Sequence, residues 1–303
     1  APGRCLTARR EAYVRSCKKT ERSERTEEET TAMSHLYIES DTNPRVKRWK
    51  RLAADARAVR REGAALLEGI HLLGVILEHP EIEVHAVILC SGAATEEARE
   101  LAERLSTQKN ACVFLLAGRI YDEISPVENG VGVMCEIAVP AAPDESLWKN
   151  ADALYLDGVQ DAGNVGTLIR SAAAAGVATI VASPKTAGLW TPRVMRAGMG
   201  AHFAVRLVEG MPVRRFREIY EGRLLAADAR GGENLFLADD YTAKGPVCWM
   251  MGAEGPGLSQ EALAASDERY WIPIAAGVES LNVAAAAAVC LFDSSRRRLA
   301  RRR

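Results

Sequence analysis

A turn rich in Asp, Gly and Asn joins a strand to a helix in the segment Leu156-Asp-Gly-Val-Gln-Asp-Ala-Gly-Asn-Val-Gly-Thr-Leu-Ile-Arg170. The apolar run at 153–156 predicts the strand, and the helix is predicted over 165–175 with Asn164 as its N-cap. A second apolar run at 179–182 predicts the next strand. Strands that alternate with helices in this way are typical of a parallel sheet covered on both faces.

The alternation continues through the rest of the C-terminal half. Apolar runs predict strands at 224–227, 247–251 and 270–274, and the residue pattern predicts helices at 213–221 and 281–292. In open parallel sheets, ligands bind beyond the carboxyl ends of the strands. We therefore expect the functional site in the loops that follow these strands.

A smaller α/β pattern precedes this one. Helical character begins at Asn43, and the elements predicted after it are a mostly apolar helix at 64–77, strands at 84–89, 111–116 and 132–139, and helices at 95–106 and 120–124. We divide the chain into a mobile tail (1–40), a small domain (41–140), a linker (141–149), a larger domain (150–293) and a basic tail (294–303). Two domains are the ordinary expectation for 303 residues.

Composition excludes several classes of protein. The chain is 48% hydrophobic and 26% charged, which is ordinary for a globular protein and unlike a collagen-like or wholly disordered chain. No apolar run reaches the roughly 18 residues of a membrane helix, and no secretory signal is visible. The seven cysteines form no C-x-x-C pair. We therefore expect reduced thiols, no metal site, no membrane partner and a cytoplasmic location.

Positive charge is concentrated in two places, although the net charge is only −1. The segment Arg45-Val-Lys-Arg-Trp-Lys-Arg51 and the segment Arg296-Arg-Arg-Leu-Ala-Arg-Arg-Arg303 are both dense in cations. Contact with a polyanion depends on local charge density, so either cluster could hold nucleic acid. An ordinary solvated surface explains the same pattern, and charge alone leaves both interpretations open.

Three segments carry polar residues at the expected edge of the sheet. They supply Asn164 and Arg170 after the first strand, Glu254 in the loop Met251-Gly-Ala-Glu-Gly-Pro-Gly-Leu-Ser259, and Ser280 and Asn282 before the last helix. Ser280 is the expected cap of that helix. Taken singly, each segment is explained as well by a capped helix or a plain turn. The glycine spacing is not a dinucleotide fingerprint, which argues against a nicotinamide dehydrogenase.

Together and in this order, the segments resemble the motifs of the SpoU (TrmH) family of RNA ribose 2′-O-methyltransferases in the SPOUT superfamily. The family's N-x-G-x-x-x-R motif matches residues 164–170, its G-x-E-G-x-G motif matches 252–257, and its I-P-x…S-L-N-V motif matches 272–274 with 280–283. The resemblance covers about residues 150–293. Residues 61–69 and 129–132 resemble, more loosely, the small ribosomal-protein-like domain that often precedes it. Gly198 stands where many members have serine.

The resemblance implies a C-terminal α/β domain with a deep trefoil knot and a small N-terminal α/β domain that binds RNA. It places S-adenosylmethionine in the knot, around Gly252, Ile272 and Leu281. Arg170 becomes the family's candidate for the group that takes or orients the proton of the ribose hydroxyl. A guanidinium stays protonated in proteins, so Arg170 could position the RNA instead. Four further residues would shape the same pocket: Asn164, Glu254, Ser280 and Asn282.

The resemblance also implies partners. Family members work as homodimers on RNA, and the expected substrate is 23S ribosomal RNA, with transfer RNA as the alternative. Some members protect antibiotic producers by methylating the ribosomal site of the drug, so a role in resistance is a further expectation. A non-catalytic RNA-binding protein of the same fold is the competing class. We expect the RNA to contact the first basic cluster, through Lys47, Arg48, Lys50 and Arg51.

Overall fold

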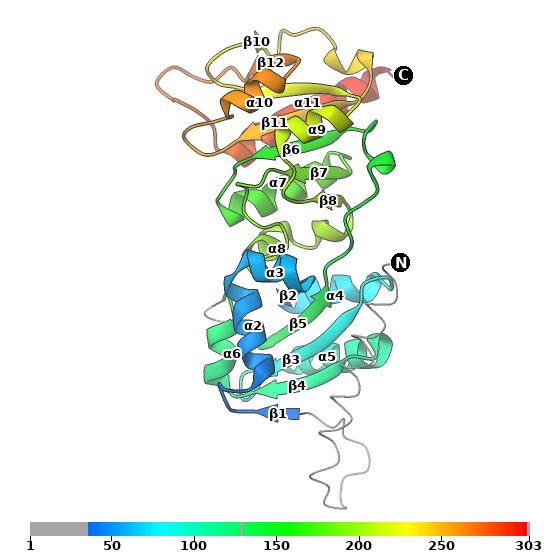
Figure 1. Cartoon of the computed structure of the whole chain (residues 1–303), viewed down its shortest axis with the longest axis vertical. Coiled ribbons are helices and arrows are strands. Elements are labelled where there is room, and N and C mark those ends of the chain that lie inside the picture. Colours follow the sequence, from blue (N-terminus) through cyan, green and yellow to red (C-terminus); the bar gives the residue numbers. More distant parts are fainter. Residues whose placement is uncertain (1–35, 128–129, 302–303) are drawn as a thin grey trace, which may run out of the picture.

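The structure is a computed structural model that describes residues 36–127 and 130–301. Two sheets lie one above the other along the long axis of the molecule (Figure 1). The first sheet holds the strands between residues 36 and 138, and the second holds those between 153 and 271. Most of the tail predicted at 1–40 lies outside the described residues, but residues 36–38 form a strand rather than a tail.

The second sheet has seven strands in the order β10-β12-β9-β11-β6-β7-β8, and every pair is parallel. The strands are β6 (Ala153–Asp157), β7 (Thr179–Ala182), β8 (Arg206–Val208), β9 (Arg223–Ala227), β10 (Glu233–Asn234), β11 (Val247–Gly252) and β12 (Glu268–Trp271). β6 and β11 are neighbours at the centre, and their register pairs Asp157 with Gly252. The loops after these two strands therefore start side by side at the carboxyl edge of the sheet.

Five helices accompany this sheet in the described part of the chain: α7 (Ala162–Ala174), α8 (Pro192–Gly198), α9 (Val213–Ile219), α10 (Gln260–Ala265) and α11 (Val283–Arg301). Helices α7 and α8 cross closely at Gly166, where an added Cβ would lie 2.4 Å from the Cβ of Ala197 and 2.6 Å from the carbonyl oxygen of Val194. Gly166 is therefore needed so that one helix backbone can approach another.

Two predicted caps are wrong. Helix α7 begins three residues before the predicted start because the Asp161 carboxylate caps it, accepting from the Asn164 backbone N–H at 2.7 Å. Helix α11 is preceded by the Asn282 side chain, which accepts from the backbone N–H groups of Ala284 and Ala285, and not by Ser280. Asp, Asn and Ser are all good capping residues, so sequence alone could not choose between Asp161 and Asn164 or between Ser280 and Asn282.

The expected basic tail at 294–303 is helical as far as the structure describes it, because α11 continues to Arg301. Arg297 is only 9% exposed and donates to the carbonyl oxygens of Leu235 and Ala238. The Arg297 guanidinium also pairs with Asp293 one turn earlier. At least this cation of the second cluster thus belongs to the packing of the second sheet.

The first sheet has five strands in the order β1-β4-β3-β5-β2, with β5 antiparallel to both of its neighbours. Its strands are β1 (Leu36–Ile38), β2 (Ala64–Glu68), β3 (Val84–Cys90), β4 (Cys112–Leu116) and β5 (Val133–Ala138). Its helices are α2 (Pro44–Ala54), α3 (Ala56–Glu62), α4 (Ile70–Glu78), α5 (Glu96–Lys109) and α6 (Gly118–Ile124). The three strands predicted in this part are therefore present.

The helix predicted at 64–77 is wrong in its first half. Residues 64–68 form strand β2, and α4 starts only at Ile70. Gly69 separates the two elements with a φ of 100°, a conformation that glycine adopts without strain. The whole segment is apolar because β2 is buried, so hydrophobic periodicity cannot separate the strand from the helix that follows it.

The two parts of the chain meet around α8, which lies between the sheets (Figure 1). A Cβ on Gly188 would lie 2.7 Å from the Cβ of Ala56, and a Cβ on Gly200 would lie 3.0 Å from a methyl carbon of Val75. The His71 Nε2 donates to the carbonyl oxygen of Met199 at 3.3 Å. The first part thus packs directly against the segment that contains α8.

Candidate active site

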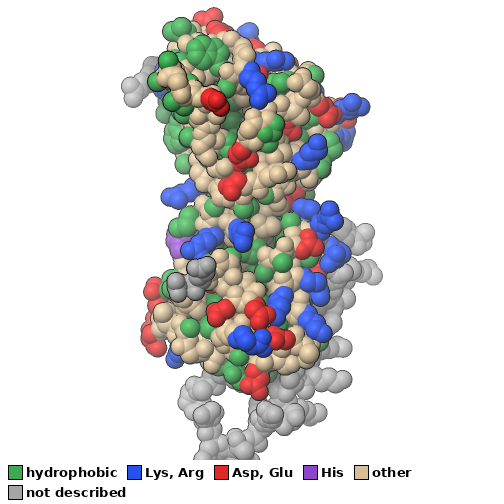
Figure 2. Space-filling model, turned by 90° about the vertical axis from the view of Figure 1, so that its left-hand side faces the viewer, with side chains coloured by type: hydrophobic (Ala, Val, Ile, Leu, Met, Phe, Trp, Pro, Cys, Tyr) green, Lys and Arg blue, Asp and Glu red, His purple; other side chains and the backbone are tan. Residues whose placement is uncertain are grey.

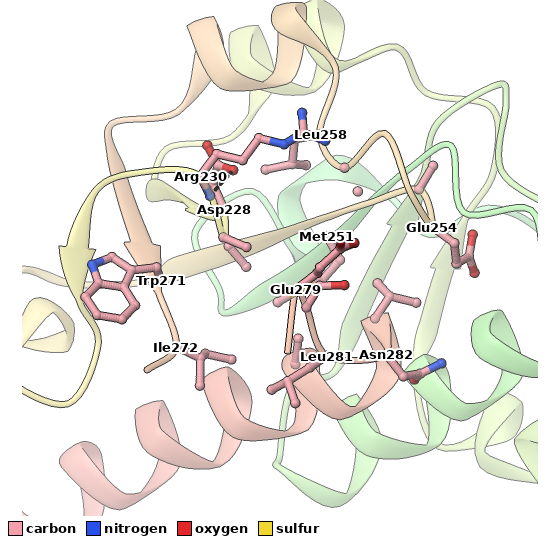
Figure 3. A pocket seen from close by; sticks show the side chains of 18 of the residues that line it. Asp228, Arg230, Met251, Glu254, Leu258, Trp271, Ile272, Glu279, Leu281 and Asn282 are labelled. Carbon is pink, nitrogen blue, oxygen red and sulfur yellow. Dashed lines mark hydrogen bonds between the residues drawn. The ribbon is translucent and has the colours of Figure 1, made fainter. Parts of the chain in front are cut away.

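A pocket of about 510 Å³ opens at the carboxyl edge of the second sheet. Its walls come from the loops that follow β9, β11 and β12 and from the start of α11. All three residues predicted to bind the cofactor line it, namely Gly252, Ile272 and Leu281. Figure 3 shows Ile272 and Leu281 in the lining. Its volume is in the range of small-molecule sites.

Gly252 is fixed by its own loop. A Cβ at this position would lie 2.1 Å from the carbonyl carbon of Gly257 and from the backbone nitrogen of Leu258. The loop folds back because Ala253 and Gly257 exchange two backbone hydrogen bonds, of 3.1 and 2.9 Å. The Arg230 guanidinium donates to the Gly255 carbonyl oxygen at 3.1 Å and so holds the tip of this turn. Gly252 is required for the wall of the pocket to close.

Three of the predicted polar residues form one chain of hydrogen bonds. The Asn164 side-chain NH₂ donates to Glu254 Oε1 at 2.8 Å, and the Asn282 NH₂ donates to Asn164 Oδ1 at 2.9 Å. The Asn282 Oδ1 in turn accepts from the first N–H groups of α11. A helix N–H can only donate and a carboxylate can only accept, so both amides have a single possible orientation. The three motifs are thereby joined in space.

Ser280 and Arg170 lie outside this chain. Ser280 lines the pocket in an exposed loop, and its hydroxyl bonds to no residue that the structure describes. Arg170 is exposed on α7, two turns beyond Asn164, and does not line the pocket. Among residues 36–127 and 130–301 its guanidinium has no hydrogen-bond or ion-pair partner. It is therefore free to bind an anion from solvent.

Sequence reasoning missed two residues that support the site. Asp157, the last residue of β6, accepts from the Ser259 backbone N–H at 2.7 Å and so links the loop after β6 to the loop after β11. Asp161 caps α7 and fixes the backbone of Asn164. The sequence held a signal for both residues. Asp157 directly follows the strand predicted at 153–156, and Asp161 stands three residues before the Asn of the first motif.

The four residues of the predicted RNA-binding cluster differ in exposure and in their partners. Arg48 pairs with Glu62 and with the fully buried Glu136, and Lys50 pairs with Asp41 and Glu123. Lys47 and Arg51 are exposed, and Arg51 lies 3.6 Å from Glu62. Within the described residues, three of the four cations are thus engaged in ion pairs, although Arg51 stays exposed beside Glu62.

The buried carboxylate of Glu136 explains why Arg48 is held. Burial alone would raise the pKa of Glu136, but the His85 hydrogen bond and the Arg48 charge outweigh it and lower that pKa below its ordinary value. The Trp49 indole N–H also donates to Glu136, at 2.7 Å. A buried carboxylate needs such partners, so Arg48 has a structural role.

The charged residues that line the pocket are mostly acidic. Asp228, Glu254 and Glu279 provide carboxylates, and Arg230 provides the guanidinium already placed on the Gly255 carbonyl (Figure 3). The apolar side chains of Met251, Leu258, Ile272 and Leu281 complete the lining. In the ranges that the structure describes, no group of three His, Cys, Asp or Glu side chains is placed to hold a metal ion. None of the described helices is long and apolar enough to cross a membrane.

The larger domain of the chain is similar to a known protein family. Residues 152–292 match the model of the SpoU rRNA Methylase family. A relative from Pseudomonas syringae pv. tomato, the 23S rRNA (guanosine-2′-O-)-methyltransferase RlmB, is 31% identical over 243 residues, which cover 78% of this chain and 96% of the relative.

Two solved structures are similar over most of the chain. A putative RNA methyltransferase of the TrmH family from Porphyromonas gingivalis is 27% identical with a TM-score of 0.71, over 84% of this chain and 98% of that one. The SpoU methyltransferase AviRb from Streptomyces viridochromogenes, in complex with AdoMet, is 22% identical with a TM-score of 0.73, over 85% and 98%. At 22% identity the second likeness shows the fold, and a role in antibiotic resistance stays a prediction.

The parallel sheet with a pocket at its carboxyl edge, together with the match to the family model, identifies an RNA methyltransferase. The chain belongs to the SpoU rRNA methylase family. The predicted family, fold class and class of enzyme are thereby confirmed. The strand order of the second sheet is consistent with the knot that the resemblance implies.

Proposed function

We propose that this protein transfers a methyl group from S-adenosylmethionine to the 2′-hydroxyl of a ribose in ribosomal RNA. The observation that carries the proposal is the chain of hydrogen bonds from Glu254 through Asn164 to Asn282. It fixes the rim of the pocket to α7, the helix that carries Arg170. These hydrogen bonds thus fix the position of the pocket relative to the helix that carries the unpaired Arg170 guanidinium.

The pocket fits the proposed cofactor. The cofactor supplies a methyl group on a positively charged sulfur, which makes that carbon open to attack by a hydroxyl oxygen. The carboxylates of Asp228, Glu254 and Glu279 outnumber the single guanidinium of Arg230 in the lining, which favours a ligand that carries positive charge. Apolar side chains and backbone groups of the 251–258 segment complement a flat, weakly polar ring.

Arg170 is assigned to positioning. Its guanidinium stays protonated, so it is unsuited to accept the proton of the hydroxyl, which passes to water as the C–O bond forms and the methyl–sulfur bond breaks. It is exposed and unpaired toward the described residues, and its planar fork matches a phosphate. Holding the phosphate beside the target ribose aligns the hydroxyl with the methyl group, and such alignment supplies a large part of the rate in transfer reactions.

The choice of ribosomal RNA follows the relatives. The Pseudomonas relative is a 23S rRNA methyltransferase by name, and the present chain covers nearly all of it. Transfer RNA is the alternative substrate. We infer a cytoplasmic location because ribosomal RNA is made and assembled there in bacteria.

Methyl transfer to protein-free 23S ribosomal RNA tests the proposal, with transfer RNA as the comparison. Wild-type protein and S-adenosylmethionine labelled in its methyl group should label the ribosomal RNA. After alkaline hydrolysis the label should sit in a dinucleotide resistant to cleavage, because a 2′-O-methyl group blocks the hydroxyl that attacks the phosphate. Label in single nucleotides would mean base methylation and contradict the proposal. Label only in transfer RNA would move the substrate assignment.

We also propose a homodimer. Phe292 and Leu299 are 49% and 61% exposed on helix α11 and lie about two turns apart, and this helix packs against α7. Large apolar side chains exposed on one helix are typical of an interface. Light scattering should give twice the mass of the chain, and Phe292→Glu with Leu299→Glu should shift that mass to one chain. A wild-type mass of one chain would contradict the dimer.

A further inference from the structure

Helix α8, which crosses α7, presents a cationic face. Its buried residues are Pro192, Val194, Met195 and Gly198, which face the core. Met199, which caps the C-terminal end of α8, is 43% exposed, and the exposed residues within the helix are Arg193 and Arg196, three positions apart. On a helix such residues are neighbours on one face. We call this face, together with His71, the α8 tract.

The tract continues from the larger part of the molecule onto the first. His71, exposed on α4, donates to the carbonyl oxygen of Met199 at the end of α8. Figure 2 shows Lys and Arg side chains together with a histidine at the narrow waist between the two parts. Because α7 and α8 cross at Gly166, one turn before Arg170, the tract also adjoins the helix of the proposed positioning residue.

The cations of the tract are available. Arg193 and Arg196 have no hydrogen-bond or ion-pair partner among the residues that the structure describes, like Arg170. One carboxylate lies near enough to feel this charge. Burial raises the pKa of Glu68 on β2, and hydrogen bonds from Ser125 and Tyr121 and the charge of Arg196 oppose that rise. Glu68 is held by those hydroxyls, so Arg196 remains without a direct salt bridge.

The first basic cluster lacks this availability, because Arg48 and Lys50 are held by four carboxylates. A cation that already pairs with a carboxylate neutralises little phosphate charge, so it displaces few of the counterions condensed on the RNA. Unpaired cations displace more of them and therefore provide most of the salt-dependent affinity. The two clusters can therefore be ranked by their partners, although their sequences look equally basic.

We propose that the α8 tract, through Arg193 and Arg196, holds the phosphate backbone of the RNA substrate between the first domain and Arg170. This inference rests on the proposed function and names the surface by which that function reaches its substrate. Arg170 would then bind the phosphate next to the reacting ribose, and the tract would bind phosphates further along the strand. The exposed Met199 side chain offers an apolar contact between them and the first domain.

The test compares four double variants with the wild type, three to glutamine and one to lysine. The test variant is Arg193→Gln with Arg196→Gln. The matched control is Arg99→Gln with Arg104→Gln, two exposed arginines on α5 that also lack partners among the described residues. The third variant, Lys47→Gln with Arg51→Gln, removes the two exposed cations of the first cluster.

Binding to protein-free 23S ribosomal RNA is measured at several salt concentrations, beside S-adenosylmethionine affinity by calorimetry. For the α8 variant we expect the slope of log affinity against log salt to fall by roughly 1.4 to 1.8, since each lost phosphate contact removes about 0.7 to 0.9. Cofactor affinity should stay within about twofold of wild type. The α5 control should keep the wild-type slope, and Arg193→Lys with Arg196→Lys should retain most of it.

An unchanged slope in the α8 variant would overturn the proposal, and so would an equal loss in the α5 control. A loss confined to the Lys47 and Arg51 variant would return the RNA site to the first cluster. These outcomes are separate from failure of the proposed function. Wild-type protein that binds this RNA but methylates none would refute the function and leave the binding surface to be judged by its slope.

Discussion

The side chain of Asn164 donates to Glu254 at 2.8 Å across 90 positions of sequence. One residue lies in the first turn of α7 and the other in the turn after β11, and these elements meet because β6 and β11 are paired. A polar contact that joins two loops in this way sets the shape of the pocket rim. Loss of this contact should lower the rate of methyl transfer more than it lowers the stability of the fold.

Asn164→Asp tests this contact. The change keeps the size of the side chain but puts a carboxylate against Glu254, so the two groups repel at neutral pH. We expect the rate of methyl transfer to fall about 10²-fold, the scale of a small misplacement in an active site. Single-turnover assays measure the rate. Thr167→Ala, which removes a hydroxyl bonded only to its own helix at Gly163, should stay near wild type; an equal loss there would point to damage of α7 as a whole.

Arg170→Ala should abolish methyl transfer and leave S-adenosylmethionine affinity nearly unchanged. Arg170 does not line the pocket, and it makes no hydrogen bond or ion pair with a residue that the structure describes. Arg170→Lys should fail as well, because an ammonium cannot reproduce the planar fork that binds phosphate in two places. Calorimetry and turnover are measured on the same preparations. Near-normal turnover of the lysine variant would rule out the positioning role.

Gly252→Ala should weaken both the loop and the cofactor site. The new Cβ would lie 2.1 Å from the backbone of Gly257 and Leu258, so the turn must open. We expect a loss of stability of about 1–3 kcal/mol, as for other overpacked positions, and a clear drop in cofactor affinity. Thermal melting and calorimetry measure the two effects. Gly231→Ala is the control, because an added Cβ there has no atom within 4 Å. Wild-type cofactor affinity in Gly252→Ala would mean that the pocket is assigned wrongly.

His202 should make the fold sensitive to mild acid. Burial lowers the pKa of His202 from its ordinary value of 6.5 to about 4. Below pH 6.5 the unfolded chain binds a proton that the folded chain refuses, so stability is full above this pH and is lost as the pH falls toward 4. We expect the free energy of unfolding to drop by about 2 kcal/mol from this residue between pH 7 and 5. Urea unfolding at both pH values measures the drop.

The control for this prediction is a pair of substitutions. His202→Gln should remove most of the acid-dependent loss, while His79→Gln, at a partly exposed histidine, should leave it in place. The same drop in His202→Gln as in wild type would assign the pH dependence to other groups, such as the buried Glu136 carboxylate with its Arg48 and His85 partners. The buried position of His202 also explains the glycine at 198, because a Cβ there would lie 2.4 Å from the His202 ring.

Sequence could predict the strands and the family, but not the partners of individual side chains. The parallel strands were visible because buried strands are continuous apolar runs. The same property hid the boundary at Gly69, where an apolar strand meets an apolar helix. Arg48 illustrates the second limit, since its buried partner Glu136 is 88 positions away. Charge density along the chain carries no information about such pairs.

The site shows the same division. The three motifs were found as spacings, and their resemblance to a family indicated which residues belong together. The structure shows that Asn282 caps α11 in place of Ser280, and that Asp161 caps α7 in place of Asn164. Both choices follow from backbone geometry that only the folded chain reveals. Adjacent capping residues differ by too little energy for sequence to rank them.

The fixed direction of the two amides has an evolutionary consequence. Each Asn must turn its oxygen toward α11 and its nitrogen toward Glu254, because the helix end supplies hydrogens and the carboxylate takes them. An Asn in this chain donates one hydrogen bond and accepts another. A replacement that can only accept, or only donate, keeps one of these two bonds and loses the other. Descendants of this enzyme can therefore change the rim of the pocket only by substituting several of these positions together, although they lie in three separate stretches of the gene.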